Sequence, residues 1–404
     1  MNRQLPKWLR FGGEYRARFE GSSAIGFKPD NGDYYLLNRF RINMKLLPSS
    51  WMKFVFQGQD SRVFWNSRVP DAPPYADTMD LRLAYMELGD TDTRPISLRV
   101  GRQELFFGEQ RLIGHLNWTN TARSFDAVRA TFRHQGYRLD AFAASVVNLR
   151  NGEFDSRIAG NNLHGLYGGI EKLVPNAIIE PYLLWRLEPG VRTESGALAH
   201  RDFKTVGFRW VGKLPANFDY GVEIAGQTGS VGTDSIRAWG GHWLLAYTIA
   251  GARYKPRLIA EYNHASGDKD PRDGKRGTFD QLYPTGHEKY GLADQVGWRN
   301  IHDVRSGVEL KPHAKWLLTG SYHSWWRASS RDGLYNAAGV LLPGSTSKPG
   351  RYVGQELDFQ AIYTASKQFQ IGGGFAQIFP GALLKNATAG RPYNFPYLML
   401  TTSF

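Results

Sequence analysis

The chain has 404 residues, of which 42% are hydrophobic and 22% charged, so it is too apolar for a disordered protein. It contains no apolar run of about 18 residues, which excludes a helical membrane protein, and no cysteine, which excludes disulfide scaffolds, thiolate metal sites and cysteine nucleophiles. The formal net charge of +13 predicts attraction for an anionic partner such as nucleic acid, acidic polysaccharide or lipid head groups.

Residues 9–20 alternate between apolar and charged side chains. Odd positions hold apolar residues such as Phe11 and Phe19, whereas even positions hold Arg16, Arg18 and Glu20. Residues 36–46 repeat this division. The two-residue period of a β-strand places the two sets on opposite faces, while a helix would scatter both around its axis. Both segments are therefore predicted strands with one apolar and one charged face.

The same alternation returns along the whole chain. It predicts 18 strands, at residues 9–20, 36–46, 52–60, 81–88, 96–105, 124–133, 137–146, 163–171, 178–188, 204–214, 218–227, 236–248, 252–265, 301–311, 315–326, 353–363, 369–379 and 396–404. A length of about ten residues per strand is typical of membrane-spanning β-barrels.

The connections between these strands alternate between short and long. Short links fall at residues 47–50, 134–136, 174–176, 214–217, 312–314 and 366–367; long polar links fall at 21–34, 61–79, 106–123, 147–162, 189–203, 228–235, 266–300, 327–352 and 380–395. Outer-membrane barrels have short periplasmic turns and long extracellular loops. We therefore predict an all-β fold: one antiparallel up-and-down transmembrane barrel of about 18 strands, spanning residues 1–404 as a single domain. Links 266–300 and 327–352 are expected to fold inward as a constriction or gate.

The polar faces of the strands combine Arg with Glu, which indicates a crowded, water-filled lumen rather than the solvent face of a soluble sandwich. The alternation predicts that the pore is lined by Arg16, Arg18, Arg39, Arg41, Lys45, Arg82, Arg99, Arg129, Arg133, Arg209, Arg305 and Lys311, with the acids Glu14, Glu20, Glu223, Glu261, Glu309, Glu356 and Asp358. Arginine pairs carboxylates bidentately and stays charged, so this lumen favours anions. For each arginine, the alternative is a structural role in ion pairs that brace the wall.

Arg102 has an ambiguous position in this pattern. It shares the parity of Ile96 and Val100, which would point it at lipid. A bulge at Gly101 would turn it into the lumen, and we include Arg102 in the expected pore lining on that basis.

Tryptophans occur at two kinds of place. Trp8, Trp51 and Trp316 lie near strand ends and are expected in interfacial aromatic girdles. Trp118, Trp325 and Trp326 lie near loop bases, where the alternative is stacking on sugar rings in the pore mouth.

The chain ends suit a protein of the bacterial outer membrane. Residues 397–404 alternate as a strand that ends in Phe404, similar to the C-terminal strand of bacterial outer-membrane barrels. Met1-Asn2-Arg3 runs directly into the first predicted strand, so we expect this sequence to be the mature part of a secreted precursor, without its signal peptide.

Three groups of residues resemble the alginate export family of outer-membrane barrels. The first is Val100-Gly101-Arg102-Gln103-Glu104-Leu105, followed by Gly108, Arg111-Leu112-Ile113-Gly114, Asn117-Trp118 and Arg123-Ser124-Phe125-Asp126. The second is Gly277-Thr278-Phe279-Asp280, with Leu282-Tyr283-Pro284, Gly286 and Trp298-Arg299-Asn300; the third is Val353-Gly354-Gln355-Glu356-Leu357-Asp358. The resemblance implies an 18-stranded monomeric barrel with an arginine-lined pore for anionic polysaccharide. This basic chain departs from the longer alginate transporter, whose loops are acidic.

No catalytic or metal-binding motif is visible. The sequence has no HExxH and no Gly-x-Ser-x-Gly, and residues 268–274 match a calcium loop poorly because the glycine falls one place late. We therefore expect no enzyme, cofactor or metal, and no nucleic-acid partner.

The predicted function is passive, anion-preferring transport of an acidic polysaccharide. Outer-membrane lipid and lipopolysaccharide, and periplasmic secretion-complex proteins, are its other candidate partners. The alternatives are a porin for small anionic nutrients or oligosaccharides, a lipase or protease barrel, and a soluble basic β-protein that binds polysaccharide or nucleic acid.

Overall fold

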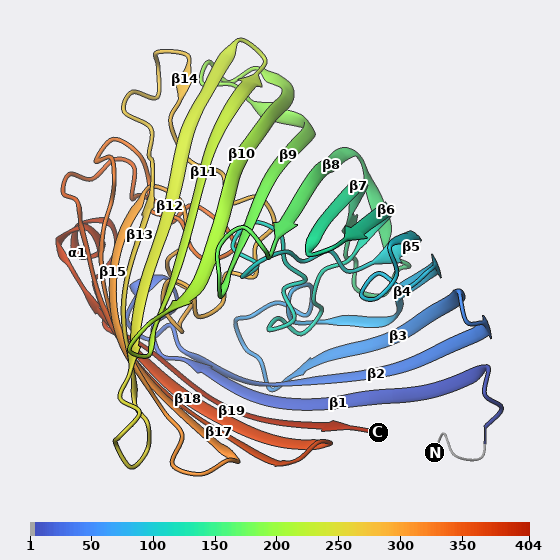
Figure 1. Cartoon of the computed structure of the whole chain (residues 1–404). Coiled ribbons are helices and arrows are strands. Elements are labelled where there is room, and N and C mark those ends of the chain that lie inside the picture. Colours follow the sequence, from blue (N-terminus) through green and yellow to red (C-terminus); the bar gives the residue numbers. More distant parts are fainter. Residues whose placement is uncertain (1–4) are drawn as a thin grey trace.

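The computed structural model describes residues 5–404; Met1-Asn2-Arg3, on which the expectation of a mature chain rests, lies outside them. Figure 1 shows antiparallel strands arranged around a barrel with loop segments inside it. The strands are β1 (Leu9–Ser22), β2 (Asp33–Ser49), β3 (Met52–Phe64), β4 (Asp77–Leu88), β5 (Ile96–Gln103), β6 (Phe125–His134), β7 (Tyr137–Asn148), β8 (Ser156–Ile170), β9 (Ala177–Arg192), β10 (Leu198–Leu214), β11 (Phe218–Val231), β12 (Asp234–Thr248), β13 (Arg257–Ala265), β14 (Lys275–Arg276), β15 (Ile301–Leu310), β16 (Trp316–Trp326), β17 (Tyr352–Ser366), β18 (Phe369–Pro380) and β19 (Tyr393–Ser403). The helical elements are the 3-10 turn η2 (Ile25–Phe27) and α1 (Ala382–Ala387).

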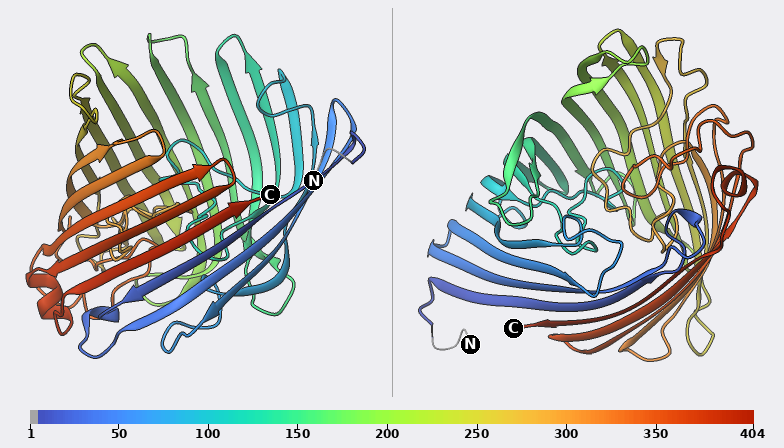
Figure 2. Two further views of the ribbon diagram at one scale, coloured as in Figure 1. Left: turned by 90° about the horizontal axis from the view of Figure 1, so that it is seen from below. Right: turned by 180° about the vertical axis from the view of Figure 1, so that it is seen from behind.

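The sheet closes on itself. Each long strand pairs antiparallel with its neighbours in the chain, and β19 pairs with β1, with Arg16 opposite Thr401. The two-residue β14 is an exception, since it runs parallel to β12. The start of β1 and the end of β19 lie at the same end of the barrel, as the two views of Figure 2 show. The prediction of an all-β, closed, antiparallel barrel with 18 long strands is confirmed.

No helix within residues 5–404 is long and apolar enough to cross a membrane.

The apolar face of each strand points out of the barrel. Tyr15 and Phe40 are opposite one another on β1 and β2 and keep more than a third of their surface exposed, whereas the neighbouring Arg16 and Arg39 are buried. The same holds around the sheet for Val128, Leu166, Val206, Leu245, Val304 and Phe359, which are all exposed. Apolar side chains on the outside are stable only in lipid, so this surface fits a membrane-spanning barrel. Trp8, Trp51 and Trp316 are exposed near strand ends, as expected for girdles.

Two of the predicted long links are mostly strand. Strands β9 and β10 cover most of residues 189–203 and leave a turn at 193–197, and β11 and β12 leave a turn at 232–233. Beyond the bilayer both faces of a strand meet water, so the alternation of side chains disappears while the backbone hydrogen-bond ladder continues. In contrast, the strand predicted at 252–265 begins only at Arg257, because residues 249–255 form turns.

The outward face generates a stability prediction. Phe208 lies near the middle of residues 204–214, the part of β10 with alternating side chains, and is 37% exposed, so Phe208→Lys places a charge near mid-bilayer. We expect it to lower the free energy of unfolding by about 2–4 kcal/mol, and Leu214→Lys at the strand end by about 0–1 kcal/mol. Denaturant unfolding of the refolded protein in lipid vesicles measures both. Equal losses would contradict this placement of the membrane.

Candidate functional site

Two loops enter the barrel and bind each other. The first inner loop, residues 104–124, connects β5 with β6, and the second inner loop, residues 266–300, connects β13 with β15. Both lie within the barrel in Figure 1. Their backbones pair: the amide of Gly114 donates to Tyr283 over 2.8 Å, and that of Tyr283 donates to Leu112 over 2.9 Å. A Cβ on Gly114 would lie 2.3 Å from Oγ1 of Thr285, so glycine permits this close approach.

The inward course of residues 266–300 agrees with the expectation from the sequence, whereas that of residues 104–124 was not predicted. The expectation of inward folding rested on the length of each link, and the first inner loop is shorter than residues 266–300 and 327–352. The apolar residues of the first inner loop could have indicated its inward course. Leu105, Phe107, Leu112 and Ile113 are all buried, and Phe107 stacks on Tyr167 of the barrel wall. A loop that faced only water would not need these residues.

The third long segment, 327–351, packs against the second inner loop. The amide of Gly297 donates to Tyr335 over 2.8 Å, and that of Ala337 to Asp294 over 3.1 Å. Arg327 holds the segment in shape, since its guanidinium donates to the carbonyl oxygens of Asp332 and Ser345.

An arginine cluster faces the first inner loop. It consists of Arg16, Arg18, Arg39, Arg41 and Arg82 on β1, β2 and β4, and each is at most 5% exposed. Within residues 5–404 they have three carboxylate partners: Glu14 bonds Arg39 over 2.6 Å, Glu20 bonds Arg18 over 2.6 Å, and Glu104 bonds Arg82.

Several of the other arginine donors bond the backbone of the first inner loop. Arg16 and Arg39 each donate over 2.9 Å to the carbonyl oxygen of Asn117, and Arg18 donates to that of Trp118. Burial acts to raise the pKa of Glu104, but Arg82 lowers it, so this carboxylate stays ionised. The cluster is therefore organised, hydrogen-bonded and richer in cations than in anions.

Trp118 links the arginine cluster to the second inner loop. Its ring stacks on His287 at 3.7 Å between centroids, and Cζ of Arg18 lies 3.8 Å from its centroid. His287 and Arg18 thus cover the ring surface of Trp118 on which a sugar would stack. Burial acts to lower the pKa of His287, but Asp294 and Glu288 raise it from 6.5 to about 9, so the imidazole is charged at neutral pH.

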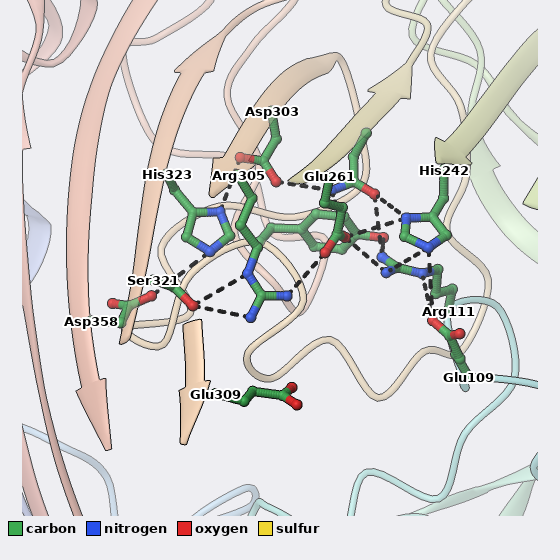
Figure 3. Close-up of polar contacts among 12 residues, drawn as sticks. Glu109, Arg111, His242, Glu261, Asp303, Arg305, Glu309, Ser321, His323 and Asp358 are labelled. Atoms are coloured by element: carbon green, nitrogen blue, oxygen red, sulfur yellow. Dashed lines mark hydrogen bonds and ion pairs between the residues drawn. The ribbon is translucent and has the colours of Figure 1, made fainter. Parts of the chain in front are cut away.

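The wall formed by β12 to β17 carries a second polar network, drawn in Figure 3. Arg111 of the first inner loop reaches Glu261 on β13 over 2.9 Å, and Arg305 on β15 reaches the other oxygen of Glu261 over 2.9 Å. His242 lies 3.3 Å from the same carboxylate. Burial acts to lower the pKa of Arg111, but Tyr290 and Glu261 raise it above its ordinary value, so it remains a cation. Arg111 thus anchors the first inner loop to the wall.

The sequence model of the family described as Alginate export matches residues 7–394. The chain belongs to the alginate export family. Among solved structures, it is similar to outer-membrane barrels of Pseudomonas aeruginosa at low identity. OpdO matches with a TM-score of 0.66 and 12% identity over 99% of this chain and 98% of that one. OccD3 (OpdP) matches with a TM-score of 0.64 and 12% identity over 99% and 92%.

The outer membrane protein opdK matches with a TM-score of 0.64 and 9% identity over 98% of this chain and 99% of that one. No curated protein matches this chain. These likenesses concern the fold. With the family membership, they identify a β-barrel channel of the bacterial outer membrane.

The residues that carry the family resemblance dock the inner loops. Arg123 donates to the carbonyl oxygens of Gly114 and Pro284, one in each inner loop. Asp280 fixes the second inner loop to β9 and β10 through Arg186 at 2.9 Å and Arg201 at 3.1 Å. Burial acts to raise the pKa of Asp280, but the arginines lower it below its ordinary value.

Glu356 and Asp358 lie on the inner side of β17, in a setting that sequence analysis did not foresee. Glu356 accepts the amide of Ala293 over 2.9 Å, so it too holds the second inner loop. Asp358 lies 3.7 Å from Nε2 of His323. In this alginate-export barrel, the acidic pair contacts a loop and a histidine rather than an arginine.

The other expected lining residues are engaged in pairs along the wall. Arg99 bonds Glu87 over 2.5 Å, Arg129 bonds Asp140 over 2.7 Å, and Arg209 bonds Glu180 over 2.7 Å and Glu109 over 3.1 Å; Arg133 donates to the carbonyl oxygen of Thr91 over 2.8 Å. They are not gathered at one point. The structure brings together the arginine cluster and, separately, Arg305 and Arg209 in the network of Arg111, since Arg209 and Arg111 both pair with Glu109.

Arg102 does not face the lumen. The pairing of β5 with β4 and β6 is regular through Gly101, so no bulge turns the strand. Arg102 therefore keeps the parity of the exposed Ile96, and its guanidinium pairs with Asp126 over 2.8 Å. Gly101 serves a different purpose: with φ at +119°, its Cβ would lie 2.3 Å from the carbonyl oxygen of Ala84. The bulges lie in β4 instead, between Gln57 and Gly58 and between Gln59 and Ser61 of its partner β3.

The charge on His287 predicts a pH dependence of the inner loops. Because its pKa is raised, the ion pairs with Asp294 and Glu288 stabilise the loop fully below pH 6.5 and are lost as the pH rises through about 9. We expect the current noise of single channels to rise between pH 7 and pH 10. His287→Gln, which cannot be protonated, is the control and should remove this dependence. An unchanged dependence in the variant would assign it to another group.

Proposed function

We propose that this outer-membrane channel is passive and anion-preferring, with an acidic polysaccharide or its oligomers as cargo. The observation that carries the proposal is the arginine cluster, in which five buried guanidinium groups face three carboxylates. Fixed cations beside a narrow aqueous path raise the local concentration of anions, and they do so without direct contact. Transport then needs repeated weak attraction rather than tight binding.

A cavity next to the cluster supports the same preference. It has a volume of about 420 Å³ and is lined by Arg18, Arg123 and His287 together with Glu20 and Asp294. Burial lowers the pKa of Arg123 to about 10, so Arg123, like His287, is charged at neutral pH. A carboxylated sugar would find three cations and two anions here.

Uptake of small anionic nutrients is the second candidate. It is favoured by the backbone pairing of the two inner loops across the barrel interior, which narrows the path. Liposome swelling with sodium glucuronate and with longer uronate oligomers separates the candidates. Passage of monomers alone supports nutrient uptake, whereas passage of hexamers supports polysaccharide transport.

Ion selectivity tests the role of the cluster. In a salt gradient across a planar bilayer, we expect a reversal potential that indicates anion preference, and Arg41→Gln should reduce the permeability ratio by roughly two- to threefold. Arg62→Gln is the matched control, because Arg62 pairs with Asp60 and its side chain is 54% exposed. Cation preference in the unaltered protein would refute the proposal.

Channel conductance tests the narrowing of the path. Arg111→Ala removes the anchor of the first inner loop but leaves Glu261 with Arg305. We expect a single-channel conductance about twofold higher, since a loop freed from its buried ion pair samples open positions. Arg257→Ala is the control, since Arg257 on β13 pairs with Asp219 on β11 and with Glu309 on β15, both on the barrel wall. Equal conductance in both variants would show that Arg111 does not hold the constriction.

A further inference from the structure

Three buried carboxylates meet at the outer end of the barrel. Asp77 and Asp80 belong to β4, and Asp155 ends the loop between β7 and β8. One oxygen of each lies within 4.8 Å of an oxygen of the other two. They are 1%, 4% and 9% exposed, so water does not screen their mutual repulsion well.

An irregularity in β4 brings Asp77 and Asp80 to the same face. Residues three apart in a regular strand point to opposite sides. Here the register shifts, so that Asp80 pairs with Gln59 and Asp77 with Ser61. The extra residue is accommodated at Met79, whose φ is +55° and whose side chain is 77% exposed. Both carboxylates therefore point inward, toward Asp155.

No basic side chain neutralises the three acids. Among residues 5–404, no Lys, Arg or His nitrogen lies within 4 Å of a carboxylate oxygen of Asp77, Asp80 or Asp155, whereas Glu87 and Asp140 on the same wall have such partners. Arg102 is near, but it donates to the carboxylate of Asp126 and to the backbone oxygen of Asp155.

Asp77 in particular lacks a partner. Its Oδ1 is buried and accepts no hydrogen bond. The other two acids each accept backbone amides, since Asp80 accepts those of Leu81 and Asp155, and Asp155 accepts that of Arg150. A buried carboxylate without a donor is costly unless a cation or proton occupies the space beside it.

We propose that Asp77, Asp80 and Asp155 bind a calcium ion. Calcium takes several carboxylate oxygens in flexible geometry and completes its shell with carbonyl oxygens and water, whereas magnesium requires a near-ideal octahedron. Two strand residues and one loop residue provide this kind of adaptable, oxygen-only site. The bound ion would tie the loop of residues 149–155 to β4. This proposal rests on the fold alone and is independent of the proposed cargo.

Calcium titration of the full chain, refolded in a zwitterionic detergent that does not chelate metals, tests the site. By isothermal titration calorimetry with CaCl₂ we expect one site per chain, with a dissociation constant of about 10⁻⁴–10⁻³ M, as in extracellular calcium modules. Asp77→Asn should abolish binding. Glu153→Gln is the matched control, because it removes one negative charge from an exposed residue of the same loop and should leave binding unchanged.

Thermal unfolding adds a readout that a purely structural role of Asp77 would not produce. In EDTA, Asp77→Asn should be at least as stable as the unaltered protein, since it removes like-charge repulsion. In CaCl₂ only the unaltered protein and Glu153→Gln should gain stability. If Asp77→Asn does not refold, Asp155→Asn replaces it. The proposal would be overturned if the unaltered protein showed no saturable calcium binding, or if the Asp77 or Asp155 variant bound calcium as tightly as the unaltered protein.

Discussion

Closure of the sheet by the β1–β19 pairing is the constraint on which the rest of the structure depends. Lipid offers no hydrogen-bond partner, so each backbone amide and carbonyl in the bilayer must be satisfied within the sheet. The ladder between Glu14–Glu20 and Tyr397–Ser403 satisfies the last free edge. Once the sheet is closed, the pleat determines that Tyr15 faces lipid and that Arg16 faces the interior. Closure and pleat together thus decide which side chains of each strand point into the barrel.

Buried charges in the interior serve to position loops. Arg111, Asp280 and Glu356 each join an inner loop to the wall, and the arginine cluster holds the first inner loop by its carbonyl oxygens. Such pairs add modest net stability because desolvation offsets much of their attraction, but breaking one leaves an uncompensated charge. These ion pairs therefore fix the positions of the inner loops more than they stabilise the barrel. The charged residues of the barrel interior are thus the ones that hold the inner loops in place.

Sequence reasoning located the strands because apolar and charged residues alternate wherever one face meets lipid. It failed where that contrast ends: in β9 to β12 the strands continue beyond the bilayer, and residues 189–203 looked like a loop. Arg102 shows the other kind of limit. A glycine in a strand is compatible with a bulge or with close backbone approach, and only the register of β5 against β4 distinguishes them. The alternation of side chains along β5, taken alone, places Arg102 on the correct face.

Alternation, loop lengths and charge were enough to specify a closed antiparallel barrel, its number of long strands and the inward face of Arg16 and Arg39, because each depends on near neighbours in the chain. The tertiary structure alone decided which residues meet. Arg111 and Glu261 are 150 positions apart in the sequence. Asp77 and Asp155 come together through the irregularity in β4 and the loop between β7 and β8. Contacts of this kind depend on how closed strands and inner loops fill one volume, and no local pattern encodes that packing.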